Sequence, residues 1–136
     1  MKRTAHAVWN GSGKEGTGHL STQSKTLDQT QYSYLSRFEE GVGTNPEELV
    51  AAAHAGCFSM KLSFVLGEAG FTPDSIETDC EVSMEDGSIK TSHLSVKAKI
   101  PNINVEEFQK AAKQAAETCP ISMTLKSTIT HEATLL

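Results

Sequence analysis

Three cysteines, Cys57, Cys80 and Cys119, are the residues best suited to chemistry in this chain. A thiolate is a strong nucleophile, and two thiols that meet can exchange with a disulfide, so a pair of them could do redox chemistry. An odd number at wide spacing does not form the disulfide framework of a small secreted protein. What the cysteines can do therefore depends on the elements that carry them.

Cys57 lies in the middle of a segment that predicts a long helix, residues 44–70. Thr44 and Glu47 fit a capping box, and Asn45 followed by proline offers a second start one residue later. A glycine, Gly67 or Gly70, is expected to end the helix.

One apolar stripe of this helix is expected to face the core, with Cys57 at its centre. The stripe consists of Val50, Ala53, Cys57, Met60 and Phe64. The second half of the helix is apolar nearly all round, which predicts a helix buried in the middle of the fold. The alanines and glycine before Cys57 would let another group approach the helix closely.

Cys119 and Cys80 are expected on a second helix and on a strand. Asn104 and Glu107 form a capping pair, and the apolar stripe that begins at Phe108 reaches Cys119, directly before a proline that stops the helix. Cys80 alternates with acidic residues in residues 76–84, which predicts an inward strand position and a buried, inert thiol.

The remaining pattern predicts strands. Residues 5–9, 19–27 and 30–38 are expected to form strands, the last ending near Arg37. The glycine-rich residues 10–18 have the spacing of a dinucleotide-binding motif, but that motif must open a helix. Strand-like residues follow instead, so a hairpin turn is the better interpretation. A hairpin of alternating residues covers 76–100, and a last strand covers 125–136. Strands and helices do not alternate strictly, so the expected class is α+β, with antiparallel sheets and a single domain over residues 1–136.

Composition excludes several classes of protein. With 12 basic and 17 acidic residues the net charge is −5, which does not favour a nucleic-acid partner. No run of about 18 apolar residues predicts a membrane span, and no apolar secretory segment follows Lys2 and Arg3, so the expected location is the cytoplasm. The apolar content of 38% is modest, and such a small chain often completes its core against a second copy.

Cys57 needs help to ionise if it is to react. It lies about three turns into its helix, where the helix dipole contributes little, and burial in apolar surroundings would raise its pKa. A nearby cation must therefore stabilise the thiolate. Arg37 is the candidate, although a solvated arginine at the end of a strand is an equally good interpretation.

These residues resemble a known family. The segment GTNPEELVAAAHAGCFSMKL, with Arg37 upstream and CPIS at residues 119–122, resembles the osmotically inducible protein C / organic hydroperoxide resistance family. The N-terminal WNGSGKEGTGHLST and the order of elements also fit, so the resemblance covers nearly the whole chain. The form HAGCFSM is closer to the osmotically inducible branch.

The resemblance implies a thiol peroxidase with no metal or other cofactor. Cys57 matches the peroxidatic cysteine and Cys119 the resolving cysteine, which would join in a disulfide that a dithiol donor reduces; lipoylated proteins serve some members. Arg37 matches the arginine that stabilises the thiolate, and Glu47 matches the glutamate that orients it. The family fold has sheets around a long buried helix in an intertwined homodimer.

Two expectations about the site follow from geometry. Glu47 and Cys57 are ten residues apart, about 15 Å along an unbroken helix, so an arginine paired with Glu47 would reach Cys57 only if the chain folded back or if it came from another subunit. We therefore expect the site at a homodimer interface. Phe38, Met60 and Phe64 would line an apolar pocket that favours organic hydroperoxides over hydrogen peroxide.

Three other hypotheses for the function of these residues stay open. His54 with Cys57 and Cys119 could bind a metal ion, but no second pair of ligands has suitable spacing. A cysteine–histidine hydrolase would need a base aimed at the nucleophile, and His54 points about 60° away from Cys57 on a helix. A redox sensor or an apolar-ligand-binding module could use the same cysteines without turnover.

Overall fold

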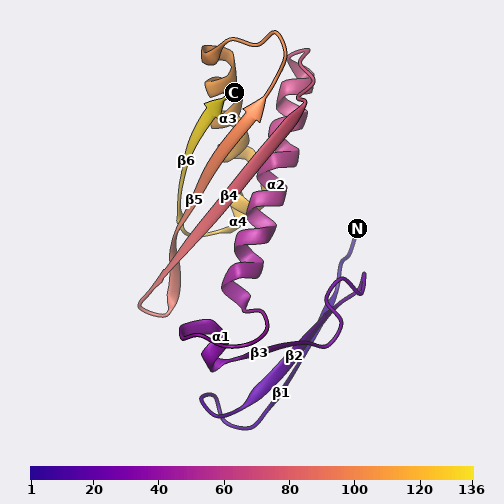
Figure 1. The fold of residues 1–136 in the computed structure, drawn as a ribbon, viewed down its shortest axis with the longest axis vertical. Helices are drawn as coiled ribbons and strands as arrows, with labels where there is room; N and C mark the ends of the chain where they lie inside the picture. The colour runs from indigo at the N-terminus through magenta and orange to yellow at the C-terminus, as the bar shows by residue number, and fades with distance from the viewer. The chain divides into compact units, whose positions relative to one another are not determined.

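Two three-stranded sheets and four helices make up the fold, as a computed structural model of residues 1–136 shows (Figure 1). The chain divides into two units, residues 1–49 and 50–136, which are described in turn. The α+β class predicted from the sequence is confirmed.

The first unit contains an antiparallel sheet in the order β1-β2-β3, as expected. Its strands are β1 (Ala5–Asn10), β2 (Thr17–Thr22) and β3 (Thr30–Ser33). The glycine-rich turn joins β1 to β2, and Gly11 there has a φ of +93°, a conformation that favours glycine. The predicted hairpin turn is thus confirmed.

The strand predicted for residues 30–38 is only half right. After β3 the chain forms a short helix, α1 (Tyr34–Phe38), which carries Arg37. The side chains of Ser33 and Ser36 form a capping box, in which each accepts a hydrogen bond from the other's backbone N–H, at 3.2 and 2.8 Å. This local bonding starts a helical turn where the period-two spacing of the aromatic residues had indicated a strand.

The first unit has no buried large apolar side chain. Its buried side chains are the polar ones of Ser33, Ser36 and Thr44, whereas Leu35 and Phe38 are about half exposed, at 48% and 47%. A three-stranded sheet needs an apolar face packed against something to be stable. The unit therefore lacks a hydrophobic core of its own.

Helix α2 (Pro46–Glu68) carries Cys57. The Asn45 side chain accepts a hydrogen bond from the Glu48 N–H at 2.8 Å, so the second of the two predicted starts is correct. At the other end Gly70 has a φ of +89°, and the Phe71 N–H reaches back to the Leu66 carbonyl at 2.9 Å, which ends the helix.

The second unit contains a sheet in the order β4-β5-β6. Its elements are β4 (Ser75–Glu85), β5 (Ser88–Lys99), α3 (Val105–Thr118), α4 (Pro120–Thr124) and β6 (Thr128–Leu135). The β4–β5 hairpin is antiparallel, as predicted, and turns through Asp86 and Gly87, both with positive φ. Three of the four strand pairings are antiparallel, as expected, and the fourth departs from the expectation, because β6 runs parallel to β5. The crossover through α3 and α4 brings the chain back in the same direction.

The core of the second unit lies between its sheet and helices α2 and α3 (Figure 1). It consists mainly of Phe58, Leu62, Leu66, Leu94, Val96, Ala98, Phe108, Ala111 and Ala115. The capping of α3 by Asn104 and its inward stripe to Cys119 are both as predicted. The core is thus supplied by segments far apart in the sequence.

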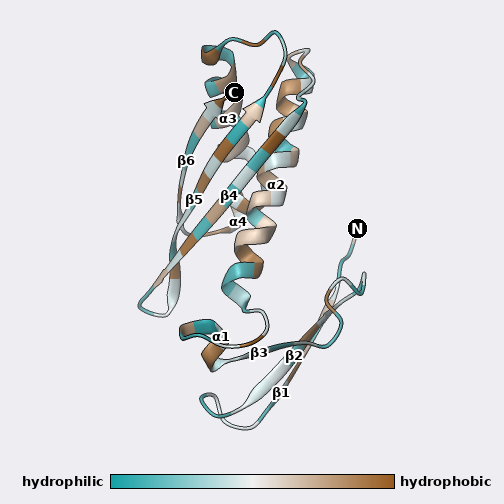
Figure 2. Ribbon diagram, in the orientation of Figure 1, coloured by the Kyte–Doolittle hydropathy of each residue, from teal (hydrophilic) through white to brown (hydrophobic).

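The predicted inward stripe of α2 is wrong. Met60 and Phe64 are exposed, at 66% and 63%, and the buried side chains are instead those of His54, Phe58, Leu62, Val65 and Leu66. Figure 2 shows hydrophobic colours along the middle of α2, with hydrophilic residues at its start. Because α2 is apolar on several sides, periodicity could not indicate which side faces the core. Within one chain α2 is therefore buried on one side only.

Helix α2, with 23 residues, is also long and apolar enough to cross a membrane. Five of its side chains nevertheless pack into the core, and Phe58, Leu62 and Leu66 are fully buried there. A core helix shows the same length and composition, and we assign α2 to that class.

Candidate functional site

Cys57 and Cys119 come together in the second unit. Cys57 is half-buried on α2, and Cys119 is fully buried at the junction of α3 and α4. Both are free thiols, and the thiol of Cys119 lies close enough to interact directly with that of Cys57. The structure thus brings together the two cysteines that the sequence had singled out as a pair.

The environment of Cys57 disfavours its thiolate within a single chain. Burial raises the pKa of the Cys57 thiol, and the neighbouring Cys119 thiol raises it further. Two groups act in the opposite direction, since the Ile121 backbone faces the sulfur and Lys61 contributes its positive charge. A reactive Cys57 needs more positive charge than these two groups supply.

The position of Cys119 is set by backbone hydrogen bonds on both sides. Its N–H donates to the Ala115 carbonyl at 2.9 Å, which closes α3, and its carbonyl accepts from the Met123 N–H at 3.0 Å, which opens α4. Pro120 takes the first position of α4, where a missing N–H costs nothing. Cys119 is therefore held at a corner between two helices.

Arg37 and Glu47 form an ion pair in the first unit. The Arg37 Nε donates to Glu47 Oε1 at 3.1 Å, and Nη2 donates to the same oxygen. The hydrogen bond from Arg37 lowers the pKa of the Glu47 carboxyl, and the same bond raises the pKa of Arg37. The arginine is thereby held as a fixed cation, in the pairing that the family resemblance implies.

The expected substrate residues fall in both units. Phe38 lies in the first unit beside its neighbour Arg37, whose guanidinium carbon is 4.9 Å from the centre of the ring. Met60 and Phe64 lie on the exposed side of α2 in the second unit. The pocket that they were expected to line stays a prediction.

A buried polar network surrounds His54, and the sequence pattern does not predict it. The imidazole is fully buried, with Nδ1 2.6 Å from the Ser92 Oγ and Nε2 2.7 Å from the Ser122 Oγ. Cys80 extends the network, since its sulfur lies 3.3 Å from the Ser92 Oγ and 3.9 Å from His54 Nδ1. The available signal was Ser92, a serine at an inward position of a strand whose other inward residues are apolar.

The alternative metal site has no support in this geometry. His54 contacts two serines and Cys80, and no group of three or more His, Cys, Asp or Glu side chains is placed to hold a metal ion. Burial lowers the pKa of His54 and raises that of Cys80, so burial favours the neutral form of each group over an ion pair.

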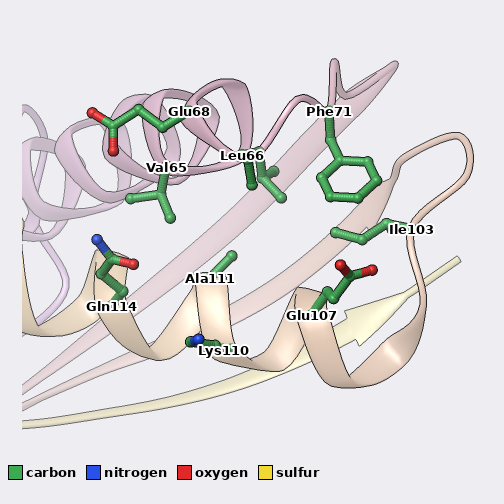
Figure 3. A pocket seen from close by; sticks show the side chains of 10 residues that line it. Val65, Leu66, Glu68, Phe71, Ile103, Glu107, Lys110, Ala111 and Gln114 are labelled. Atoms are coloured by element: carbon green, nitrogen blue, oxygen red, sulfur yellow. The ribbon is translucent and has the colours of Figure 1, made fainter.

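A cavity of about 310 Å³ lies between the end of α2 and α3 (Figure 3). Apolar side chains such as Val65, Leu66 and Phe71 form one part, and Glu107 and Lys110 lie on the α3 side. None of the predicted site residues lines this cavity. It is therefore separate from the cysteine pair.

Comparisons with known proteins show the family of this chain. The family model described as OsmC-like protein matches residues 39–134. The peroxiredoxin OsmC of Escherichia coli K12 is 44% identical over 96% of this chain and 94% of its own length. An organic hydroperoxide resistance protein-like protein of Staphylococcus aureus MSSA476 is 33% identical over 82% of this chain and 81% of its own.

Solved structures show the same fold. The organic hydroperoxide resistance protein OhrB of Bacillus subtilis superposes with a TM-score of 0.65 at 25% identity, covering 98% of both chains. An OsmC-like protein from Mycoplasma pneumoniae gives a TM-score of 0.78 at 15% identity, covering 100% of this chain and 98% of its own. The chain therefore belongs to the OsmC-like protein family and, like its peroxiredoxin relative, is a cysteine-based peroxidase.

Proposed function

We propose that this chain reduces organic hydroperoxides, and hydrogen peroxide less well, to alcohols or water at the expense of a dithiol. The observation that carries the proposal is the proximity of the thiols of Cys57 and Cys119, which come from different helices and pack in the same core. Relatives named for peroxiredoxin activity and for organic hydroperoxide resistance support the substrate class.

The reaction balances in three steps. The Cys57 thiolate attacks the terminal peroxide oxygen, the O–O bond breaks, and the alkoxide leaves as an alcohol after taking a proton, so that Cys57 becomes a sulfenic acid. Cys119 then attacks the Cys57 sulfur, a disulfide forms and water leaves. An external dithiol reduces the disulfide by exchange and is itself oxidised to a disulfide.

Arg37 and Glu47 are the proposed source of the positive charge that Cys57 requires. The guanidinium would stabilise the thiolate and donate a hydrogen bond to the peroxide, while Glu47 holds it in place. Because α2 is continuous from Pro46 to Glu68, Glu47 and Cys57 are about 15 Å apart along its axis. We therefore propose that Arg37 and Glu47 of one subunit serve Cys57 of a second subunit in a homodimer.

Two surfaces support a homodimer. The first unit has no buried large apolar side chain, and α2 leaves Met60 and Phe64 exposed. Burying one such side chain contributes about 1.5–3 kcal/mol. A second copy would cover these surfaces, and residues 1–136 would then act as one functional domain. We also propose that Phe38, Met60 and Phe64 hold the organic part of the peroxide.

The reductant and the location follow from the same chemistry. A dithiol, for example on a lipoylated protein, can reduce a disulfide without leaving a mixed disulfide behind. Free thiols that cycle in this way fit a reducing compartment, so we place the protein in the cytoplasm.

Consumption of cumene hydroperoxide in the presence of dihydrolipoamide tests the proposal. Wild-type protein should consume many equivalents, and Cys57→Ser none. Cys119→Ser should accumulate sulfenic acid and then over-oxidise, which mass spectrometry detects. Cys80→Ser is the matched control and should remain within about twofold of wild type, because Cys80 contacts neither thiol of the pair.

Two results would contradict the proposal. An inactive Cys80→Ser protein with an active Cys57→Ser protein would show that Cys80, and not Cys57, is the nucleophile. Consumption of a single equivalent by wild type, with dithiol in excess, would indicate a redox sensor instead.

A further inference from the structure

His54 and its two serines form a buried polar cluster in the second unit that the proposed mechanism does not use. His54 lies one turn before Cys57 on α2, Ser92 lies on β5, and Ser122 lies on α4. Their hydrogen bonds therefore join three elements that are far apart in the sequence.

The hydrogen bonds of the imidazole are complete in its neutral form. A neutral imidazole has one donor nitrogen and one acceptor nitrogen, and a hydroxyl can serve as either partner. The distances of 2.6 and 2.7 Å to the two hydroxyls use both nitrogens. Since the ring is fully buried, losing either serine would leave one nitrogen without a partner.

Helix α4 depends on this cluster for its position. It has only five residues, which is too short to be stable by its own hydrogen bonds. Ser122 is the one buried residue of α4, and its hydroxyl forms a hydrogen bond with His54 Nε2. The bond from Ser122 to His54 thus anchors α4 to α2.

The position of α4 matters because Cys119 lies at its start. Cys119 is the residue that opens α4, and its thiol lies near that of Cys57. The position of Cys119 therefore depends on where α4 lies relative to Cys57. A shift of about 1 Å in a reacting group can cost a hundredfold in rate.

We propose that His54 and Ser122 are positioning residues for the disulfide-forming step, because their hydrogen bond holds the Cys119 end of α4 against Cys57. This inference rests on the proposed function. The fully buried imidazole bonds only to other buried side chains, and Cys119 takes part only in the second step, so the effect is expected where Cys119 attacks the Cys57 sulfenic acid.

Single-turnover kinetics of Ser122→Ala tests this role. Protein is mixed with one equivalent of cumene hydroperoxide and quenched over time, and mass spectrometry measures the Cys57 sulfenic acid, trapped with dimedone, and the disulfide. We expect sulfenic acid to form within about twofold of the wild-type rate and the disulfide to form at least about tenfold more slowly. Ser122→Thr keeps the hydroxyl and should restore most of the rate.

Ser59→Ala is the matched control. Ser59 lies on α2, is half-buried and shares a hydrogen bond of 2.7 Å with Thr78 on β4, so this variant also loses a hydroxyl bond between elements but does not touch α4. Its disulfide should form at the wild-type rate. His54→Gln is a second test if it folds, and should resemble Ser122→Ala.

A second measurement needs no peroxide. In a glutathione redox buffer the equilibrium constant for the Cys57–Cys119 disulfide should fall about tenfold in Ser122→Ala and stay unchanged in Ser59→Ala. Disulfide formation at the wild-type rate in Ser122→Ala, or an equal loss in Ser59→Ala, would overturn the positioning role and leave the proposed function intact. Absence of a Cys57 sulfenic acid in wild type would overturn both.

Discussion

His54 links the stability of the second unit to pH. The ring is fully buried between two serine hydroxyls, with the Cys80 sulfur 3.9 Å from Nδ1, and burial lowers the pKa of His54 below its ordinary value of 6.5. The unfolded chain therefore binds this proton more readily than the folded one does. The corresponding stability is complete above about pH 6.5 and is lost as pH falls through the lowered pKa.

This predicts a smaller acid sensitivity for His54→Gln. Urea unfolding at pH 7.5 and at pH 5.0 should show a loss of stability in wild type that exceeds the loss in His54→Gln by about 1 kcal/mol. His6→Gln, at an exposed histidine of β1, is the control and should follow wild type. Equal losses in wild type and His54→Gln would contradict the prediction.

The cysteines show why residue type alone does not assign reactivity. Cys57 and Cys80 are both half-buried with raised pKa values, yet only Cys57 has a second thiol beside it. The neighbour of Cys80 is a serine hydroxyl. The partner, and not the burial, distinguishes the proposed nucleophile from the inert thiol.

At the scale of elements, the end of α2 is set by one glycine. Gly70 adopts a φ of +89°, which side-chain-bearing residues rarely adopt, whereas Gly67 lies inside the helix with nothing near its missing Cβ. Alanine is strained at the first position and a good helix former at the second.

Gly70→Ala should therefore lower the free energy of unfolding by about 1–2 kcal/mol, and Gly67→Ala should raise it by up to about 1 kcal/mol. Chemical denaturation measures both values. A Gly67→Ala protein less stable than Gly70→Ala would show that the left-handed turn does not end the helix.

Some of the other elements are determined by local sequence, and others depend on contacts between distant segments. The α3 cap at Asn104, the turn at Asp86 and Gly87 and the alternation of β4 and β5 follow from short-range rules, and the sequence predicts them correctly. The parallel pairing of β6 with β5 depends on where a crossover of two helices returns the chain, which no local pattern encodes.

At the scale of the molecule, the apolar surface indicates a second copy. Within one chain α2 exposes Met60 and Phe64, and the first unit buries no large apolar residue. A helix that is apolar on several sides is stable in water only when more than one side is covered. We therefore expect wild-type protein to be a dimer.

Phe64→Asp should shift the protein from dimer to monomer in sedimentation velocity, because it places a charge on the surface to be covered. Peroxidase activity should fall with the dimer. Val105→Asp is the control, since Val105 is equally exposed at 61% but starts α3, where an acidic residue is favourable. A Phe64→Asp protein that remains dimeric, or an active wild-type monomer, would refute the interface.

The sequence by itself determined the family, the helix and corner that carry Cys57 and Cys119, and the pairing of Arg37 with Glu47 as an expectation. These depend on caps, prolines and a long contiguous motif. Only the tertiary structure decided which side of α2 is buried and that Ser92 and Ser122 meet at His54. An evenly apolar helix has no preferred side of its own, and a serine finds its buried partner only when distant segments pack together.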